Sequence, residues 1–389
     1  MEYRQLGKSG LKVSAVGLGG NNFGWWADEQ ASTAVIKTAL DQGVNFFDTA
    51  NIYGEGRSEE WLGKALKGVR SQAIIATKFG YDASQDPNDK GGSRHNIIQA
   101  VEGSLRRLQT DHVDLYQMHF PDPTTPIEET LRALDDLVRA GKVRYIGCSN
   151  FAAWHLSEAL GASRLHSLSS FVSVESPYNL LNRQIEQSLI PCCEAHGIGI
   201  ITYTPLAAGF LTGKYRRGQE MTPDMRLAKV PPWGAHIMTD ENFATLARLE
   251  AFAAERGHVV GELAIAWLLS RPAVSTVIAG ATRAEQVVAN VAASNWRLNA
   301  TEVAEVDQIS QAYLGVGTVT DGTTKVLCPW CTQQTQATIP DGAVITGVRR
   351  AEYVWSLAPP DPRLVQAMCG SCLAPIHLSL DIRGQTAPQ

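Results

Sequence analysis

The chain alternates short apolar runs with helix-like patterns over about 300 residues, and this alternation is the strongest constraint on its fold. Eight runs have the length and the β-branched or aromatic content of buried strands. They cover Ser14–Gly17, Val44–Asp48, Ala73–Lys78, Val113–His119, Val143–Ser149, Phe171–Glu175, Ile198–Tyr203 and Ser275–Ile278. Eight strands that alternate with helices are the number that closes a (β/α)8 TIM barrel, and we predict an α/β fold of this kind.

Helical periodicity fills the intervals between these runs and follows the last of them. The segments with this pattern are Glu29–Gln42, Ser58–Leu66, Arg94–Leu108, Ile127–Ala140, Ala152–Leu160, Arg183–His196, Glu241–Arg256, Val260–Leu269, Ala284–Val291 and Thr301–Ala312. An open, doubly wound sheet is the alternative, but no strand is followed by a G-x-G-x-x-G turn. The segment that comes nearest to one, Gly17-Leu-Gly-Gly-Asn-Asn22, has an asparagine in place of the third glycine. Residues 1–12 are predicted to form a hairpin ahead of the barrel.

Several predicted strands end in polar residues that can take part in acid–base chemistry. Asp48 ends the second strand, Lys78 the third and His119 the fourth, and Tyr53 lies in the turn after Asp48. Taken singly, each has a structural alternative, such as an ion pair between Asp48 and Lys78 or a hydrogen-bonded core histidine. Active sites of (β/α)8 barrels are built at the carboxyl ends of the strands. The shared position of the four residues therefore favours a catalytic cluster.

The four side chains suit the reduction of a carbonyl group. A phenol has a pKa near 10, and a neighbouring ammonium is expected to lower that pKa and make Tyr53 a usable proton donor. Lys78 would supply the ammonium, and Asp48 would hold Lys78 charged and oriented. His119 would place the substrate oxygen through a hydrogen bond. No side chain donates hydride, so a redox cofactor is expected as well.

Charge and hydropathy argue against other classes of function. A net charge of −5 gives no electrostatic basis for binding nucleic acid. The N-terminal sequence Met1-Glu-Tyr-Arg-Gln5 has no apolar core of a signal peptide. The longest apolar helical run, Leu263–Leu269, is far shorter than the roughly 20 residues that span a bilayer. We expect a cytoplasmic protein with neither a membrane nor a nucleic-acid partner.

Seven motifs, in order along successive strands, resemble those of the aldo-keto reductase family. They are Asp-Thr-Ala-x-x-Tyr-Gly at 48–54, Ala-Thr-Lys at 76–78, Asp-Leu-Tyr-Gln-Met-His at 114–119, Gly-Cys-Ser-Asn at 147–150, Pro177-Tyr-Asn-Leu-Leu181, Tyr203-Thr-Pro-Leu-Ala-Ala-Gly209 and Ile278-Ala-Gly-Ala-Thr-Arg-Ala-Glu-Gln286. The resemblance runs from about residue 2 to 314. It implies a (β/α)8 barrel that reduces an aldehyde or ketone with NADPH. Tyr53 would be the general acid, supported by Asp48, Lys78 and His119.

The resemblance also implies a set of contacts to NADPH or NADP+. Ser149, Asn150 and Glu175 would lie at the nicotinamide carboxamide, and Tyr203 would stack on the nicotinamide ring. The remaining contacts would be Thr204, Pro205, Leu206, Ala207 and Lys214 along the pyrophosphate and Gly280, Thr282, Arg283, Gln286 and Asn290 at the adenosine end. The amides that begin the helix after Gly280 suit a phosphate, and Arg283 adds charge for a 2′-phosphate, although a solvated surface arginine is the alternative.

Three positions depart from the family pattern. Glu175 stands where a glutamine is usual, Ala289 replaces a frequent glutamate, and Thr204 replaces a common serine. A carboxylate at 175 can accept a hydrogen bond from the carboxamide nitrogen but cannot donate one to its oxygen. The departure therefore bears on the role of Glu175 in particular.

Residues 317–389 do not belong to the barrel pattern of residues 1–316 and carry two C-x-x-C pairs. Cys328, Cys331, Cys369 and Cys372 predict a small zinc-ribbon-like β module in which four cysteines hold a structural Zn2+. The 37 residues between the pairs exceed the usual roughly 15–20. Iron in a rubredoxin-like site and a redox-active dithiol are the alternatives, and His377 is a further candidate ligand. Two runs, Ala343–Val348 and Glu352–Leu357, are β-prone.

Two questions stay open at this level. The chain could act as a cofactor-binding sensor or scaffold through a protein partner, as potassium-channel beta subunits that resemble reductases do, and the C-terminal module could serve that partner or self-association. The substrate is expected to be a small carbonyl compound. Five aromatic residues in loops at the catalytic end favour an apolar or aromatic one, with packing between loops as the alternative: Trp25, Trp26, Tyr81, Phe120 and Trp233.

Overall fold

The computed structural model describes residues 1–81, 86, 88–223, 225–230 and 237–311, together with five strands after residue 322. The chain divides into two compact units. The first contains Met1–Glu220 and Ile237–Ser310, and the second contains Met221–His236 and the chain from Gln311 onward.

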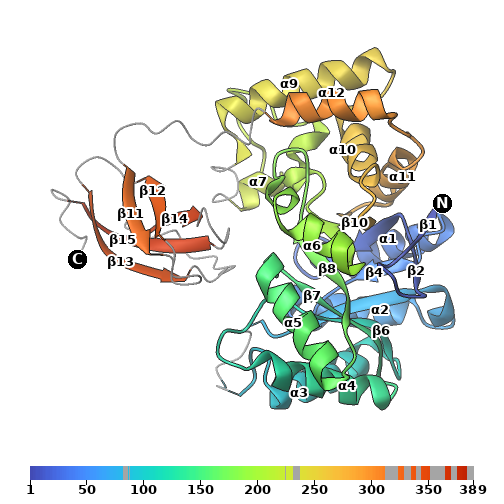
Figure 1. The fold of residues 1–389 in the computed structure, drawn as a ribbon. Helices are drawn as coiled ribbons and strands as arrows, with labels where there is room; N and C mark the ends of the chain where they lie inside the picture. Colours follow the sequence, from blue (N-terminus) through green and yellow to red (C-terminus); the bar gives the residue numbers. More distant parts are fainter. Residues whose placement is uncertain are drawn as a thin grey trace. The chain divides into compact units, whose positions relative to one another are not determined.

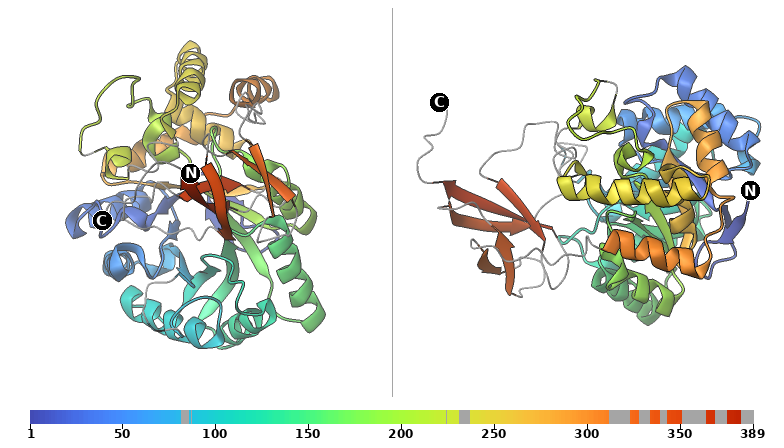
Figure 2. Two further views of the ribbon diagram at one scale, coloured as in Figure 1. Left: turned by 90° about the vertical axis from the view of Figure 1, so that its left-hand side faces the viewer. Right: turned by 90° about the horizontal axis from the view of Figure 1, so that it is seen from above.

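A closed barrel of eight parallel strands forms the first unit, as the alternating pattern predicts (Figures 1 and 2). The strands are β3 (Val16–Gly19), β4 (Phe46–Asp48), β5 (Ile74–Phe79), β6 (Val113–Met118), β7 (Val143–Ser149), β8 (Phe171–Pro177), β9 (Gly199–Tyr203) and β10 (Val274–Gly280). Consecutive strands pair, and β10 pairs with β3 to close the ring. Because all eight strands run in parallel, their carboxyl ends meet at one mouth.

Helices follow the strands and cover the barrel on the outside (Figure 1). They are α1 (Glu29–Asp41), α2 (Arg57–Ala65), α3 (Arg94–Leu108), α4 (Ile127–Arg139), α5 (Ala153–His166), α6 (Leu189–His196), α9 (Asp240–Glu255), α10 (Val260–Leu269), α11 (Ala284–Ala293) and α12 (Ala300–Gln311). Helix α1 shows why they form. The Asp28 side chain caps its first turn by accepting from Ala31 N, and Val35, Ile36 and Ala39 line its buried face at helical spacing.

Two helix boundaries differ from the sequence prediction. Helix α5 continues through Gly161 to His166, whereas the prediction ends it at Leu160. A single glycine costs a helix only about 1 kcal/mol, which packing overrides. The helix predicted over Arg183–His196 is instead a short 3-10 turn (Gln184–Glu186) followed by α6 from Leu189. Pro191 lacks an N–H and is tolerated only in a first turn, so it fixes where α6 begins.

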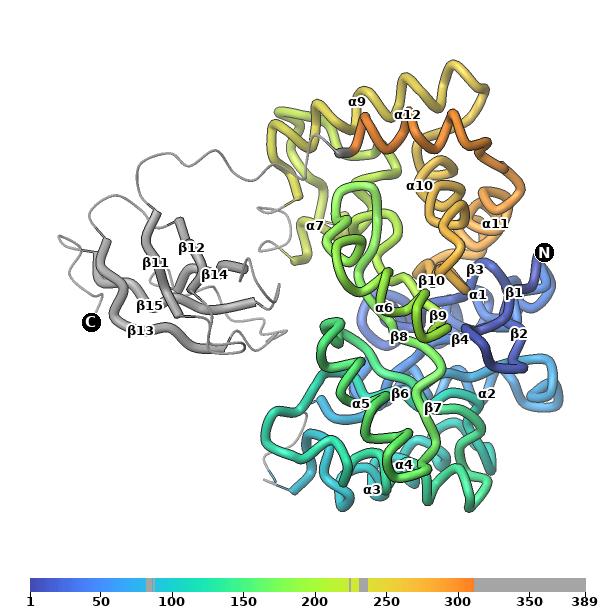
Figure 3. The backbone as a smooth tube through the Cα atoms, viewed as in Figure 1, coloured from blue at the N-terminus to red at the C-terminus, as the bar shows by residue number. Residues whose placement is uncertain are grey.

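The predicted N-terminal hairpin forms from β1 (Tyr3–Gln5) and β2 (Lys12–Ser14) and covers the amino-terminal end of the barrel. Leu6 and Val13 from this hairpin are fully buried in the same cluster as strand residues of the barrel core. At the hairpin's turn, Gly7 has a φ of +60°, and a Cβ there would lie 2.6 Å from Gly199 N. Figure 3 shows β1 beginning beside the N-terminus.

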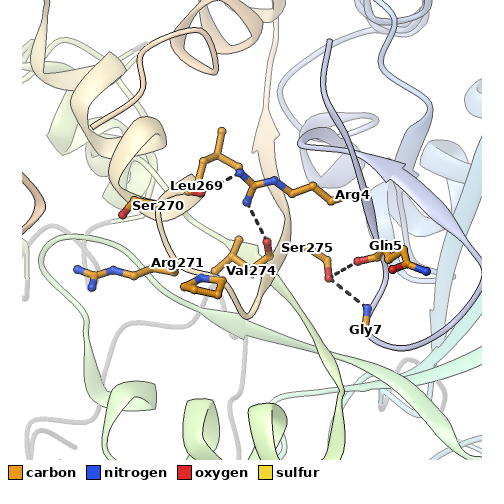
Figure 4. Close-up of a pocket in the computed structure, with 9 residues that line it drawn as sticks. Arg4, Gln5, Gly7, Leu269, Ser270, Arg271, Val274 and Ser275 are labelled. Carbon is orange, nitrogen blue, oxygen red and sulfur yellow. Dashed lines mark hydrogen bonds between the residues drawn. The ribbon is translucent and has the colours of Figure 1, made fainter. Parts of the chain in front are cut away.

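A pocket of about 420 Å³ opens at this amino-terminal end (Figure 4). Arg4 lies in its wall and donates hydrogen bonds to Leu269 O at 2.8 Å and Val274 O at 3.1 Å. Gly7 N and Gln5 O bond to Ser275 Oγ in the same wall. These groups are occupied in holding the hairpin to the barrel, so the pocket is a structural seam at the end opposite the predicted active site.

The second unit contains five described strands and the short helix α7 (Arg226–Lys229). Strands β11 (Thr323–Leu327) and β12 (Gln334–Thr338) form an antiparallel pair, and β13 (Ala343–Arg350), β15 (Pro375–Ile382) and β14 (Leu364–Met368) form a sheet in that order. Strand β13 confirms the β-prone run at 343–348. The run at 352–357 and the four cysteines lie outside the described residues.

Candidate active site

The residues predicted to form a catalytic cluster come together at the mouth of the barrel. Asp48 is the last residue of β4, Lys78 is the penultimate residue of β5, and His119 directly follows β6. Lys78 Nζ lies 2.5 Å from Asp48 Oδ1 and 5.2 Å from the centre of the Tyr53 ring. The ring centres of Tyr53 and His119 are 5.9 Å apart. The four side chains therefore form one continuous cluster, from Asp48 through Lys78 and Tyr53 to His119.

The Lys78 ammonium is fully buried and lies close to three oxygen atoms. It donates hydrogen bonds to Asp48 Oδ1 at 2.5 Å and Thr49 O at 3.1 Å, and it forms an ion pair with Glu175 Oε2 at 3.2 Å. Burial alone would favour the neutral amine, but the two carboxylates outweigh it and raise the pKa of Lys78. Lys78 is thus a permanent positive charge at the mouth of the barrel.

The turn that presents Tyr53 is strained. Gly54, Glu55 and Gly56 follow Tyr53 with φ angles of +59°, +59° and +92°. A Cβ at Gly54 would lie 2.5 Å from Phe23 O, so only glycine fits there. For the non-glycine Glu55, this conformation costs of order 1–3 kcal/mol, a strain typical of residues that frame a functional site.

The acidity predicted for Tyr53 is wrong in its direction. Lys78 does lower the pKa of the phenol, and so does a hydrogen bond from the Asn21 side chain. Burial of the hydroxyl acts more strongly in the other direction, and the carboxylates of Asp48 and Glu175 add to it. Together they raise the pKa of Tyr53 to about 12. Tyr53 is consequently a fully protonated phenol at neutral pH.

His119 is a buried, neutral imidazole at the mouth. Burial, with a smaller contribution from the Lys78 charge, lowers the pKa of His119 well below 6.5. Its ring stacks on Phe120 with centres 4.9 Å apart and lies 5.7 Å from the ring of Tyr81. Nδ1 of His119 has no hydrogen-bond partner among the described residues. A buried polar atom without a hydrogen bond raises the free energy of the folded state. At the mouth of the barrel, this atom is placed to form that hydrogen bond with a ligand.

The residues predicted at the nicotinamide lie on neighbouring strand ends. Ser149 ends β7 and Tyr203 ends β9. Asn150 joins them: its Oδ1 accepts from Tyr203 Oη at 2.7 Å, and its Nδ2 donates to Ser149 Oγ at 3.0 Å. Asn150 has a φ of +61°, and the loop after β9 has positive φ angles at Thr204 and Ala207. Pro205 and Leu206 lie within that loop.

Glu175 does not stand apart as a free acceptor. Its Oε2 faces Lys78, as given above, and accepts a hydrogen bond from Gln117 Nε2 at 2.9 Å. Gln117 also donates to Asp48 Oδ2 at 3.3 Å. Gln117 and Asn21 contact the cluster but were not among the predicted site residues. A polar residue in the penultimate position of the buried fourth strand was a signal for Gln117, since buried amides in strands need partners.

At the predicted adenosine end, the side chain of Gln286 caps the turn that precedes α11. Gly280 ends β10, and α11 begins at Ala284. Gln286 Oε1 accepts from Thr282 N at 2.8 Å and from Arg283 N at 3.3 Å. These two amides lie in the turn before the helix, whose own first turn begins at Ala284. The Arg283 side chain is exposed, and Asn290 lies one turn beyond Gln286 on α11.

The side chain of Lys214 packs beside Tyr215 and Gly209. Lys214 Nζ lies 5.2 Å from the ring centre of Tyr215, and a Cβ at Gly209 would meet the Lys214 side chain at 3.1 Å.

Within the described part of the chain, no group of three or more His, Cys, Asp or Glu side chains is arranged to hold a metal ion. No helix of that part is long and apolar enough to cross a membrane.

The model of the Aldo/keto reductase family matches residues 15–311. The chain belongs to this family. The reductase is 37% identical over 322 residues to an L-glyceraldehyde 3-phosphate reductase of Escherichia coli O157:H7. The alignment covers 79% of the chain and 92% of the relative. It is 36% identical over 316 residues to the aldo-keto reductase YhdN of Bacillus subtilis. That alignment covers 79% of the chain and 93% of the relative.

A third relative is named as a channel subunit and not as a reductase. The reductase is 38% identical over 300 residues to a probable voltage-gated potassium channel subunit beta of Oryza sativa, with 75% of the chain and 91% of the relative covered. The family and the relatives named as reductases make the chain an oxidoreductase of the carbonyl-reducing class, for which NADP(H) is the typical cofactor. The matched segment ends before the C-terminal strands β11 to β15.

Proposed function

We propose that the reductase converts an aldehyde or ketone to an alcohol with NADPH, and that Tyr53 donates the proton. The observation that supports this most strongly is the phenol of Tyr53 packed between the buried ammonium of Lys78 and the neutral ring of His119. NADPH, when bound, supplies the hydride. The residues of the chain then have to place the carbonyl, deliver one proton to its oxygen and stabilise the charge that develops.

Each step has a residue in the geometry described above. The His119 ring is neutral at pH 7, and its Nδ1 has no partner within the described part of the chain, so it can donate a hydrogen bond that positions the carbonyl oxygen. Tyr53 stays protonated until pH approaches about 12, so it is available as the acid when hydride arrives at the carbon. Lys78 then stabilises the phenolate that remains, and Asp48 keeps the ammonium oriented.

The residues at the mouth fit the cofactor. Asn150, Thr204 and Ala207 share strained left-handed backbone on the loops after β7 and β9, which is typical of ligand clamps. Ser149 and Asn150 would hold the carboxamide, Tyr203 would stack on the ring, and Lys214 would meet the pyrophosphate. The exposed Arg283 would bind the 2′-phosphate, so a preference of the protein for NADH over NADPH would contradict that role.

The test of the proton donor is Tyr53→Phe. This variant should lose at least about a hundredfold in NADPH-dependent carbonyl reduction, since general-acid catalysis typically contributes 10²–10⁴-fold. NADPH binding, followed by the change in cofactor fluorescence, should persist. Tyr116→Phe is the matched control, because Tyr116 is buried on β6 outside the cluster and donates only to Ile97 O at 3.4 Å. Turnover by Tyr53→Phe at the wild-type rate would exclude Tyr53 as the acid.

For the substrate, we propose an apolar or aromatic carbonyl compound. The aromatic rings of Tyr81 and Phe120 lie 5.6 Å apart and both contact His119, so they form an apolar wall beside the candidate oxygen site. Trp25 is about half exposed, while Trp233 lies outside the described residues. A panel of aldehydes should show higher kcat/KM for aromatic members. Efficient reduction of small polar aldehydes without activity on aromatic ones would contradict this specificity.

A second candidate function is that of a cofactor-binding sensor that acts through a protein partner. It is favoured by the relatives named as potassium channel beta subunits. NADPH oxidation with a carbonyl panel separates the two candidates, because a sensor binds the cofactor with little turnover. Rapid multiple turnover with any carbonyl of the panel would favour the enzyme.

For the C-terminal unit, we propose a zinc-ribbon-like module with a boundary near residue 316. Cys328 and Cys331 fall within the six residues that join Leu327 of β11 to its partner Gln334 of β12. The second pair, Cys369 and Cys372, likewise falls between the paired residues Met368 and Pro375. Two C-x-x-C pairs between paired strand ends support four-cysteine Zn2+ binding. Metal analysis of the purified full chain should give about one zinc per molecule, whereas iron or no metal would exclude zinc.

A further inference from the structure

Glu175 brings a second carboxylate to the catalytic ammonium. The side chain is 3% exposed. Its Oε2 lies 3.2 Å from Lys78 Nζ, against 2.5 Å for Asp48 Oδ1. The amide of Gln117 donates to both carboxylates, at 2.9 Å to Glu175 and 3.3 Å to Asp48. Lys78 and Gln117 therefore both contact the two acids, although a single carboxylate would neutralise the ammonium.

The charge balance of this cluster is unusual for a buried site. With both acids ionised, Asp48, Glu175 and Lys78 would carry one net negative charge away from water, which is costly. Burial, together with repulsion from Glu175, raises the pKa of Asp48 well above 3.8. Repulsion from Glu175 thus works against the Lys78 ammonium, which lowers the pKa of Asp48.

The other titratable groups around Glu175 do not cancel this charge. Tyr53 and His119 are both neutral at pH 7, as described above. Strands β7 and β9 flank β8 and contribute Ser149 and Tyr203 at its end, and the Tyr203 hydroxyl is committed to Asn150. Lys78 is therefore the one cation among the described residues of the cluster. Any negative charge on Glu175 acts on Tyr53 without a second cation to offset it.

We propose that Glu175 is a positioning residue that shares the Lys78 ammonium with Asp48 and so weakens the pull of that ammonium on the Tyr53 hydroxyl. This inference rests on the proposed role of Tyr53. Carbonyl reduction uses the phenol as an acid, whereas alcohol oxidation, the reverse reaction, uses the phenolate as a base. The additional carboxylate therefore keeps Tyr53 ready for reduction and delays oxidation to higher pH.

The competing role for Glu175 is contact with the nicotinamide carboxamide, as the family resemblance implies. Glu175→Gln separates the two roles because glutamine keeps the shape and can still accept from Gln117 and Lys78, but carries no charge. A positioning role through charge predicts a change in the titration of Tyr53. A carboxamide contact predicts a change in cofactor affinity, since glutamine can donate to the carboxamide oxygen as well as accept.

The first measurement is the alkaline absorbance change of tyrosinate in the full-length protein. The chain has 10 tyrosines, so the contribution of Tyr53 is taken as the difference between a protein and its own Tyr53→Phe variant. This difference should appear at lower pH in the Glu175→Gln background than in the wild-type background. The second measurement is NADP+-dependent alcohol oxidation at pH 9. It should be about tenfold faster in Glu175→Gln for each pH unit by which the Tyr53 titration moves.

Asp135→Asn is the matched control. Asp135 is a buried carboxylate on α4 that accepts from Ser169 N at 2.9 Å and lies outside the cluster, so its removal changes the protein charge equally. It should leave both curves in place. Coincident Tyr53 titrations in the wild-type and Glu175→Gln backgrounds would overturn the proposal, and tighter NADP+ binding with an unchanged pH profile would assign Glu175 to the carboxamide. The titration needs no turnover, so it tests Glu175 even if the protein reduces no carbonyl.

Discussion

Replacing Lys78 by methionine should destabilise the barrel strongly and in a pH-dependent way. Methionine preserves the unbranched shape but removes the ammonium, which is fully buried. Asp48, Glu175 and the Thr49 carbonyl then lose their shared donor. Removing one partner of a buried ion pair typically costs 3–5 kcal/mol, because a buried charge is left uncompensated. We expect a loss of about 3–5 kcal/mol in the free energy of unfolding at pH 8.

The dependence on pH follows from the sign of the remaining charges. Without Lys78, the pKa of the buried Asp48 carboxyl is raised further above that of the unfolded chain, so the folded state binds more protons. The destabilisation is therefore full at pH 8 and shrinks as the pH falls towards 5. The assay is urea unfolding followed by tryptophan fluorescence at both pH values. Adding Glu175→Gln to Lys78→Met should recover part of the loss at pH 8.

The control for this experiment is Lys64→Met. Lys64 forms an ion pair with Glu29 at 2.8 Å, but both side chains are half exposed. Such pairs contribute about 0–1 kcal/mol because water screens them. If Lys78→Met cost no more than Lys64→Met, or cost the same at pH 5 and pH 8, the account of a charge-compensated buried cluster would be refuted.

Two further predictions concern stability. Gly54→Ala should cost at least about 2 kcal/mol and displace Tyr53, because it adds contact with Phe23 O to the left-handed strain of about 1–2 kcal/mol. Gly68→Ala, which has φ of +84° and nothing within 4 Å of the added carbon, should show only the strain, and equal urea midpoints for the two variants would contradict the contact. Stability should also fall above about pH 9, because burial raises the pKa of the Cys148 thiol well above 9.0 and of the Tyr116 hydroxyl well above 10.0. Each group ionises first in the unfolded chain, which withdraws up to about 1.4 kcal/mol per pH unit above its unfolded pKa. Unfolding midpoints at pH 8 to 11 test this, and a flat profile would contradict it.

The fold and the heart of the site are predictable from the sequence because both depend on local pattern. Buried parallel strands are nearly continuous apolar runs, so polar residues at their ends stand out, and this placed Asp48, Lys78 and His119 at one mouth. The ends of helices are harder to predict where the local sequence signals are weak. Gly161 does not stop α5, and Pro191 determines the start of α6.

The electrostatics of the site could not be predicted in the same way. The pKa of Tyr53 is a balance between burial, one ammonium and two carboxylates. Sequence alone identifies Lys78 as a neighbour but gives neither the depth of the hydroxyl nor the turn of Glu175 towards the ammonium. Gln286 is a similar case, because its side chain occupies the amides of Thr282 and Arg283, a contact set by the local turn.

The attachment of the N-terminal hairpin has a consequence for how the protein is made. Arg4 bonds to the carbonyls of Leu269 and Val274, and Gly7 N bonds to Ser275 Oγ, so contacts join residues about 270 positions apart. During synthesis, Arg4 and Gly7 leave the ribosome well before these partners and must wait for β10 before they can dock. Non-local contacts of this kind slow folding, so the ring is sealed only late in translation, when its last strand emerges.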